Sequence, residues 1–280
     1  MMIAAMFAMM QLTANDLARL APYTIYEPMA RPPAAKIVWS DEFDGTALDP
    51  AKWSYDIDSN KTGWANNELQ YYSANRTDNA SVANGLLSIT ARADKDAVSK
   101  FPDWGGQAYS SARLLSKTSW TYGYYEIRAK LPCTPGMWPA IWMLPPDMKE
   151  WPDDGEIDIM EHVSKTPGII YATLHSANYY HIKNTQRGAV RGVPDACEAF
   201  HTYQLDWRRD EARIGVDGVA YMRIRNNLPA EGKAAWPFDR PFQLILNLAV
   251  GGDWPGPVDA TKLPQSFEVD YVRVYQTPAR

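Results

Sequence analysis

The feature that most limits the fold of this chain is a repeated two-residue alternation of apolar and polar side chains between turn residues. Successive side chains of a strand point to opposite faces, so this alternation predicts strands with one buried face. Residues 124–131 (YYEIRAKL) show it clearly, with Glu126, Arg128 and Lys130 on the polar side. Further strands are predicted at residues 86–92, 169–175, 200–207, 213–223, 242–250 and 267–275.

Turn chemistry supports an all-β fold. Asp217-Gly218 lies between two valines, which is a strong signal for a two-residue β-hairpin. Residues 242–250 (FQLILNLAV) are apolar on both faces, which places that strand centrally in a sheet. Helical periodicity is nearly absent, and only a short helix is predicted at residues 229–235. Many short strands without alternating helices predict two packed antiparallel sheets.

The 280 residues are enough for one large core, since all-β sandwiches of roughly 200–250 residues are commonly single domains. Residues 23–35 are rich in proline and are predicted to be a linker. We therefore expect a leader with its linker at residues 1–35 and the folded domain at residues 36–277.

The first ten residues form a short apolar run with the length of a signal-peptide core. The run lacks a preceding basic residue, and no clear small-residue cleavage site follows it. We expect a secreted or periplasmic protein, the alternative being that this run is a helical leader.

Composition argues against several kinds of partner. There are 28 basic and 33 acidic side chains, a net charge of −5, and no basic cluster of the kind that binds nucleic acid. No run approaches the roughly 18–20 apolar residues of a membrane span. The four histidines have no metal-ligand spacing. The two cysteines, Cys133 and Cys197, form either one disulfide or two buried thiols, and we expect a monomer.

The aromatic composition suggests a particular kind of ligand. The chain has 11 Trp and 16 Tyr but only 7 Phe. A core that needed only bulk could use Phe, whereas rings with polar edges suit a surface that binds something partly polar.

The acidic segment at residues 155–161 (GEIDIME) carries the candidate chemistry. It alternates like a strand although acidic residues are poor strand formers and like charges repel. In a regular strand Glu156 and Asp158 would share a face and Glu161 would point away, but one extra residue in a β-bulge brings all three to one side. We predict this bulge. The alternative is a solvent-facing acidic edge, with calcium bridging the carboxylates.

Two carboxylates on one face suit glycoside hydrolysis. The bulged strand separates the Cα atoms of Glu156 and Glu161 by roughly 13 Å. Inward-leaning side chains reduce the gap to the approximately 5–5.5 Å between carboxyl groups that a retaining enzyme needs. One carboxylate attacks the anomeric carbon, and the other donates its proton to the leaving oxygen. Asp158 lies between them and can hydrogen-bond the nucleophile.

The pattern E-x-D-x-x-E, followed by His162 and Val163, resembles the signature of family 16 glycoside hydrolases. Other segments resemble the laminarinase branch in the family's order: WSDEFDG (39–45), NNELQYYS (66–73), GMWPAIWMLP (136–145), LILNLAVGGDWPG (244–256) and VDYVRVYQ (269–276). The resemblance covers residues 37–276. It implies a curved two-sheet jelly roll of the concanavalin A-like kind, with a cleft on the concave face and no cofactor required for catalysis.

The resemblance also implies site residues. Glu156 corresponds to the nucleophile, Asp158 to the assisting acid and Glu161 to the general acid/base. A structural calcium ion, present in many family members, would be held by Glu42, the carbonyl of Gly85 and Asp270, with oxygen ligands that suit calcium. The alternative is that Asp270 is an ordinary surface aspartate on the last strand.

The family's substrate-binding positions correspond to Asn67, Arg113, Trp138, Trp142, His175 and Trp254. Trp138 and Trp142 are four residues apart in an extended segment, so they share a face on which sugar rings could stack. The alternatives are core packing for the tryptophans, a paired structural charge for Arg113 and a strand histidine for His175. Trp151 is a weaker candidate.

The leading hypothesis is an endo-acting, retaining β-glucanase that acts on β-1,3 linkages of laminarin-like glucans. Met160 lengthens the motif beyond the E-x-D-x-E typical of lichenases and xyloglucan transglycosylases. One alternative is a hydrolase of red-algal galactans, agarase-like or carrageenase-like, with Arg187 and Arg191 as sulfate contacts. Another is a non-catalytic β-glucan-binding protein, which the presence of both glutamates disfavours.

Overall fold

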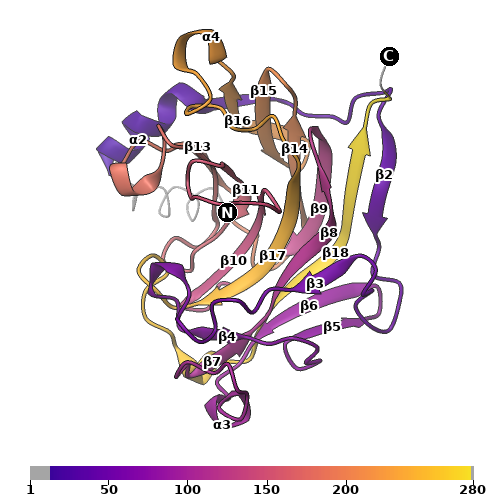
Figure 1. Ribbon diagram of the computed structural model, residues 1–280, viewed down its shortest axis with the longest axis vertical. Coiled ribbons are helices and arrows are strands. Elements are labelled where there is room, and N and C mark those ends of the chain that lie inside the picture. Colours follow the sequence, from indigo (N-terminus) through magenta and orange to yellow (C-terminus); the bar gives the residue numbers. More distant parts are fainter. Residues whose placement is uncertain (1–12, 279–280) are drawn as a thin grey trace.

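Two large antiparallel sheets curve and pack against each other in the computed structural model, which describes residues 13–278 (Figure 1). The nine-stranded sheet has the order β1 (Thr24–Pro28), β16 (Val219–Arg225), β15 (Glu211–Val216), β14 (His201–Trp207), β9 (Gly123–Lys130), β18 (Gln265–Gln276), β6 (Leu86–Ala91) and β5 (Ala80–Ala83), with β2 (Lys36–Asp41) paired to β18. This confirms the predicted all-β sandwich.

The seven-stranded sheet forms the other layer. Its order is β13 (Arg187–Gly192), β12 (Ile169–His175), β11 (Glu156–Glu161), β10 (Met137–Leu144), β17 (Phe242–Val250), β8 (Arg113–Trp120) and β3 (Trp53–Tyr55). A small parallel pair joins β4 (Gln70–Tyr72) to β7 (Tyr109–Ser111). The helices are short: α2 (Ala14–Leu20), α3 (Lys95–Val98), α4 (Leu228–Glu231) and the 3-10 helices η1 (Ala21–Tyr23), η2 (Ala65–Asn67), η3 (His181–Lys183) and η4 (Ala260–Lys262).

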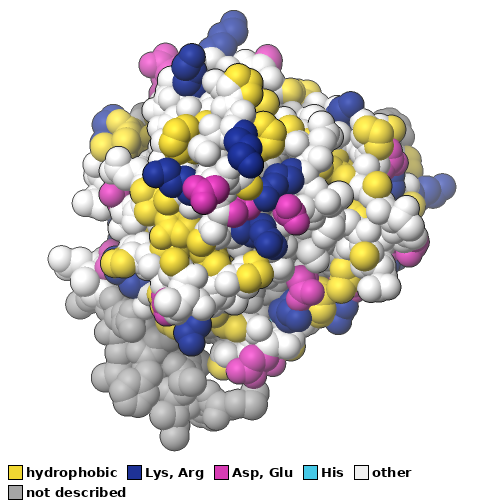
Figure 2. All heavy atoms as spheres, turned by 90° about the horizontal axis from the view of Figure 1, so that it is seen from below, with side chains coloured by type: hydrophobic (Ala, Val, Ile, Leu, Met, Phe, Trp, Pro, Cys, Tyr) yellow, Lys and Arg dark blue, Asp and Glu magenta, His cyan; other side chains and the backbone are white. Residues whose placement is uncertain are grey.

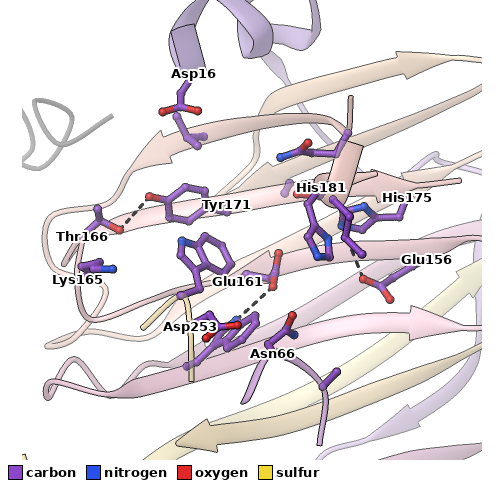
Figure 3. A pocket seen from close by; sticks show the side chains of 18 of the residues that line it. Asp16, Asn66, Glu156, Glu161, Lys165, Thr166, Tyr171, His175, His181 and Asp253 are labelled. Atoms are coloured by element: carbon purple, nitrogen blue, oxygen red, sulfur yellow. Dashed lines mark hydrogen bonds and ion pairs between the residues drawn. The ribbon is translucent and has the colours of Figure 1, made fainter. Parts of the chain in front are cut away.

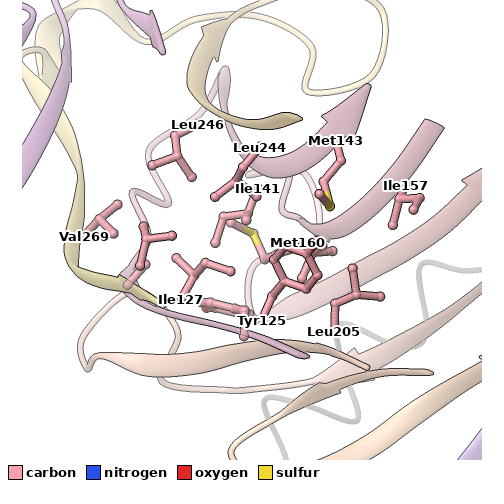
Figure 4. Packing of buried hydrophobic residues seen from close by; sticks show 14 of the residues in the cluster. Tyr125, Ile127, Ile141, Met143, Ile157, Met160, Leu205, Leu244, Leu246 and Val269 are labelled. Carbon is pink, nitrogen blue, oxygen red and sulfur yellow. The ribbon is translucent and has the colours of Figure 1, made fainter. Parts of the chain in front are cut away.

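The core lies between the two sheets. Tyr125 and Ile127 of β9 face residues of β10, β11 and β17, among them Ile141, Ile157 and Leu246 (Figure 4). Strand β17 is buried at every residue except Gln243 and pairs with β10 on one side and β8 on the other. Its predicted central position is therefore confirmed, because both of its faces are covered.

The predicted hairpin is also confirmed. Val216 of β15 pairs with Val219 of β16, and the two turn residues between them, Asp217 and Gly218, have φ angles of 51° and 74°. Positive φ at both central residues is the geometry of the type I′ turn, whose twist matches that of the flanking strands. The helix predicted near residues 229–235 is present as the single turn α4.

The predicted linker at residues 23–35 is wrong in its first part. Strand β1 pairs antiparallel with β16 at the edge of the large sheet, and Glu27 accepts a hydrogen bond from Arg223 at 3.1 Å. Pro28 is tolerated because it ends an edge strand, where a missing N–H breaks few ladder bonds. The folded part therefore begins before residue 36. The apolar run at residues 1–10 lies outside the described residues.

Cys133 and Cys197 form a disulfide, with a Cα–Cα distance of 5.7 Å. It ties the loop after β9 to the loop before β14. The structure thus decides between the two alternatives left by the sequence.

Two surface properties bear on possible partners. Within residues 13–278, no helix has the length and apolar character required to cross a membrane. On the face shown in Figure 2, basic and acidic side chains lie close together among apolar ones. This mixture is in keeping with the many arginine–carboxylate pairs of the protein, such as Arg76 with Asp94.

Candidate active site

Strand β11 contains the predicted bulge. Asp158 pairs with Thr173 of β12, and the next paired residue, Glu161, lies opposite Tyr171. Three steps along β11 thus correspond to two along β12, which is the extra residue of a bulge. Because of it, Glu156 and Glu161 both face an open cleft, whereas the intervening isoleucines and Met160 are fully buried in the core.

The cleft has a volume of about 1030 Å³. Strands β10, β11 and β12 form its floor, and the loops around residues 64–67, 181–186 and 253–254 form its walls (Figure 3). Four of the predicted substrate-binding residues line it together with the two glutamates: Asn67, Trp138, His175 and Trp254. Their roles as substrate contacts stay predictions, but the structure does bring them together.

The carboxylate of Glu156 is held in place from two sides. The indole Nε1 of Trp151 donates a hydrogen bond to Oε2 at 2.9 Å, and His175 Nε2 lies 3.8 Å from Oε1. Burial raises the pKa of Glu156 to about 7, against the opposing effects of the Trp151 and Asp158 hydrogen bonds and the positive charge of Arg113. These contacts favour the ionised form, which is the form a nucleophile requires.

The carboxylate of Glu161 is more readily protonated. Burial and the negative charge of Glu156 raise its pKa to about 8, and a hydrogen bond from Trp138 Nε1 to Oε1 at 3.2 Å only partly offsets this. Hydrogen bonds from Trp151 and Asp158 and the charge of Arg113 favour the ionised form of Glu156, whereas only the bond from Trp138 does so for Glu161. The surroundings thus favour Glu161 as the carboxyl group that keeps a proton. This is the difference expected between an acid and a nucleophile.

Asp158 is 2% exposed and lies between the two glutamates along β11. Burial, followed by the charges of Glu156 and Glu161, raises its pKa well above the usual value. Its surroundings therefore favour the protonated form of Asp158, which can donate a hydrogen bond to Glu156. Beside it, His175 Nε2 is 3.4 Å from Asp158 Oδ2. Burial lowers the pKa of His175 to about 3, so that its ring is neutral.

Aromatic rings form the wall beside Glu161. Trp254 meets Trp138 edge to face with ring centroids 5.2 Å apart, and Tyr171 meets Trp254 in the same way at 4.9 Å. Each of these rings also lines the cleft. Edge-to-face contacts hold the rings at fixed angles, so the wall presents apolar ring surfaces to the cleft.

Arg113 of β8 and Trp142 of β10 are in contact across the intervening strand β17, but neither lines this cleft. Arg113 Nε is 2.9 Å from Asp56 Oδ2, and its guanidinium lies over the rings of Trp142 and Trp64 at 4.7 and 5.1 Å. Arg113 thus forms an ion pair within the protein, as the alternative for this residue predicted. Substrate contact by Arg113 and Trp142 stays a prediction.

Several residues around the cleft were missed or undervalued by sequence reasoning. Tyr171 and Thr173 line the cleft with His175, and their period of two along β12 was a usable signal. Trp151 is only a weak candidate from the sequence, because its hydrogen bond to Glu156 depends on the conformation of the loop that carries it. His181, in η3, also lines the cleft, and its ring lies 5.3 Å from that of Trp151.

The interpretation of Arg187 as a sulfate contact is wrong, whereas that of Arg191 stays a prediction. Arg187 is buried, pairs with Glu231 and stacks on the ring of Tyr179 at 3.5 Å. Arg191 donates to the backbone carbonyl of Val219 at 3.0 Å. The guanidinium group of Arg187 is thus engaged within the protein and is not free to bind an anion.

The predicted calcium ligands do not fit a calcium site in this arrangement. Glu42 accepts two hydrogen bonds from Arg273, at 2.9 and 2.7 Å, and Asp270 is paired with Arg128. Calcium takes six to eight oxygen ligands, and here it would have to displace two arginines. The carbonyl of Gly85, in the turn between β5 and β6, adds one neutral donor only.

Comparison with known proteins agrees with this geometry. The model of the family described as "Glycosyl hydrolases family 16" matches residues 67–273. The chain belongs to glycoside hydrolase family 16. The resemblance identified in the sequence is thereby confirmed, and enzymes of this family need no cofactor for catalysis.

Relatives within family 16 are similar over most of the chain. A β-glucanase of Rhodothermus marinus is 47% identical over 256 residues, which cover 87% of this chain and 86% of that protein. The solved structure of SCLam, a non-specific endo-β-1,3(4)-glucanase, has a TM-score of 0.87 at 50% identity and covers 91% of this chain and 96% of that one. The laminarinase structure from Rhodothermus marinus has a TM-score of 0.81 at 46% identity, with coverages of 88% and 98%.

Proposed function

We propose that this protein is an endo-acting, retaining glycoside hydrolase that cleaves β-1,3-glucosidic bonds in laminarin-like β-glucans. The observation that carries the proposal is the pair Glu156 and Glu161 on one face of a bulged strand, each held by an indole N–H at the floor of an open cleft. Support comes from similar enzymes of family 16 that are named as endo-β-1,3-glucanases and laminarinases.

In the first step, the Glu156 carboxylate attacks the anomeric carbon while Glu161 gives its proton to the glycosidic oxygen. The bond from that carbon to the leaving oxygen breaks, and the sugar becomes esterified to Glu156. Trp151 holds the other oxygen of Glu156, and protonated Asp158 stabilises its charge before attack.

In the second step, Glu161, now ionised, takes a proton from water. The water oxygen attacks the anomeric carbon, and Glu156 leaves as a carboxylate. Two displacements at one carbon retain its configuration. As the negative charge of Glu156 disappears in the intermediate, the pKa of Glu161 falls, which suits its change from acid to base.

The form of the cleft supports internal cleavage of a polymer. It is open, and the residues that line it extend from Asn67 on one wall to His181 on the other, with the catalytic pair between them. A chain can therefore lie across the site without needing an end. Trp138 and Trp254 offer rings on which a glucose unit can stack.

A substrate panel tests this proposal. Release of reducing ends should be fastest on laminarin, with curdlan and lichenan tested for linkage preference and agarose and carrageenan for the galactan alternative. The first product anomer, followed by NMR, should be β. Faster release from agarose or carrageenan would replace the glucanase proposal, and an α product would overturn retention.

The nucleophile has its own test. Glu156→Gln keeps the size of the side chain and removes its nucleophilic charge, so turnover should fall at least about 10⁴-fold. Circular dichroism should show an unchanged fold. Substantial residual hydrolysis would remove Glu156 from this role, and glucan binding without hydrolysis by the unchanged protein would favour a binding protein.

We also propose that the protein acts as a monomer outside the cytoplasm, either secreted or in the periplasm. The Cys133–Cys197 disulfide supports this location, because disulfides persist in oxidising compartments. Fractionation of the producing cell and light scattering of the purified protein test the two statements. Calcium is left out of the proposal because arginines pair with the acidic side chains of its predicted site.

A further inference from the structure

A second group of reactive side chains lies away from the cleft. The disulfide between Cys133 and Cys197 packs beside His162, whose Nε2 is 3.6 Å from Cys133 Sγ. Both sulfurs and one ring nitrogen lie within 4.8 Å of one another. The mechanism proposed above uses none of these residues, and we call them the Cys-His cluster.

Nε2 is the nitrogen of the His162 ring that lies near the Cys-His cluster, 3.6 Å from Cys133 Sγ. Nε2 accepts a hydrogen bond from the backbone N–H of Gly168 at 3.3 Å, so this nitrogen carries no proton and Nδ1 carries it. The ring is fully buried, and Nδ1 has no hydrogen-bond partner. The nitrogen that lies near the sulfurs is therefore the one able to bind a metal ion.

We propose that reduction of the disulfide converts the Cys-His cluster into a binding site for a thiophilic metal ion such as Zn²⁺. Two thiolates and one neutral imidazole are the donor set of many tetrahedral zinc sites. A hard cation such as Mg²⁺ or Ca²⁺ prefers oxygen ligands and would not bind here. Three protein ligands leave the fourth position to water.

The chemistry balances with a named reductant. A phosphine supplies two electrons and becomes its oxide by taking the oxygen of a water molecule, whose two protons go to the sulfurs. A dithiol supplies two electrons and two protons and becomes a disulfide. In either case the S–S bond of the protein breaks and two thiols form. Binding of the metal then releases two protons, one from each thiol. The weak bond from Gly168 N–H to Nε2 is given up, because the lone pair of Nε2 now goes to the metal.

A small surface pocket gives both the reductant and the ion a route to the sulfurs. It has a volume of about 470 Å³ and is lined by Cys133, Cys197, Thr134 and Pro264 among others. Glu268, at its edge, pairs with Lys130 at 2.5 Å. This pocket is separate from the cleft, and none of its lining residues is shared with the cleft.

The position of the cluster gives the metal a structural effect. The cysteines lie in the loop after β9 and the loop before β14, and His162 directly follows β11. Reduction removes a covalent link between segments 64 residues apart, and a bound ion would link the same segments again. Reduced protein should thus unfold at a lower temperature than oxidised protein and regain part of the loss with Zn²⁺.

The test uses the full chain, reduced with a phosphine, freed of the reductant under nitrogen and titrated with Co²⁺. We expect sulfur-to-cobalt charge-transfer absorption together with the visible bands of tetrahedral Co²⁺, both abolished by equimolar Zn²⁺. The oxidised protein, whose sulfurs are bonded to each other, is the matched control and should show neither.

Two variants identify the ligands. His162→Gln should weaken Co²⁺ binding by at least the roughly 10–100-fold that loss of even an outer partner costs. Cys197→Ser should lose most of the charge-transfer intensity, and it serves if His162→Gln does not fold. Reduced protein without charge-transfer bands in excess Co²⁺, or equal affinity in His162→Gln, would overturn the proposal. Glucan hydrolysis is not the readout, so this result is independent of the proposed function.

Discussion

Trp151→Phe isolates the hydrogen bond to the nucleophile. The change removes the indole N–H that donates to Glu156 Oε2 at 2.9 Å. It keeps an aromatic ring, which is needed because the ring of Trp151 packs against His175, Tyr180 and His181 with centroids 5.3 to 5.7 Å apart. The variant should therefore fold, and its effect should fall on the proton affinity of Glu156.

The magnitude follows from the charge on the acceptor. A hydrogen bond to a charged group contributes about 1.5–3 kcal/mol, and one pKa unit corresponds to about 1.4 kcal/mol. Loss of the bond removes a contact that favours the ionised carboxylate, so the pKa of Glu156 should rise by about one to two units. A smaller fraction of Glu156 is then ionised at neutral pH. The pH optimum should move to a higher pH, and the maximal rate should be lower.

The assay is the pH dependence of kcat/KM on soluble laminarin, which reports the free enzyme. The acid limb should move up by about one to two pH units relative to the unchanged protein. Trp254→Phe is the control, because Trp254 lines the same cleft and its described contacts include no hydrogen bond to Glu156. An acid limb that stays in place in Trp151→Phe would refute the reasoning, as would an equal shift in the control.

Three further predictions follow from the structure. Burial raises the pKa of Glu156 from 4.5 to about 7, so its burial destabilises the folded protein progressively as the pH rises from 4.5 to 7. In urea unfolding, Glu156→Gln should therefore be more stable than the unchanged protein by about 1–3 kcal/mol at pH 8. The two proteins should be equally stable near pH 4.5. Equal stability at pH 8 would contradict this. Because Glu42 and Asp270 are paired with arginines, chelation of calcium should leave the melting temperature unchanged, and a fall of several degrees would restore the calcium prediction. Glu231→Ala breaks the ion pair with Arg187 that braces the loop bearing His181. KM for laminarin should therefore rise by several-fold with little change in kcat. A loss confined to kcat would argue against a bracing role.

Some parts of the fold could be read from the sequence because a local pattern determined them. Three carboxylates at positions 156, 158 and 161 can share one face of a strand only if a bulge lies between Asp158 and Glu161. The uninterrupted apolar run at residues 242–250 predicted a strand covered on both faces. These inferences needed only the two-residue period of a strand.

Other parts depend on contacts between distant segments. Strand β1 exists because β16 leaves an open edge, a fact that residues 24–28 do not contain. The role of Trp151 depends on where its loop places the indole, and the fixed positions of Arg187 and Arg191 depend on partners more than 25 residues away. Charge alone could not distinguish a bracing arginine from one that binds an anion.

The bulge in β11 also limits how the length of this strand can change. Glu156 and Asp158 already share a face, so deleting one of the two residues between Asp158 and Glu161 would leave the second glutamate on that same face, in the register of a regular strand. A deletion between Glu156 and Asp158 would instead turn the later side chains away from the cleft. The bulge is thus the place in this motif where one residue can be lost without moving the second glutamate to the opposite face of the sheet.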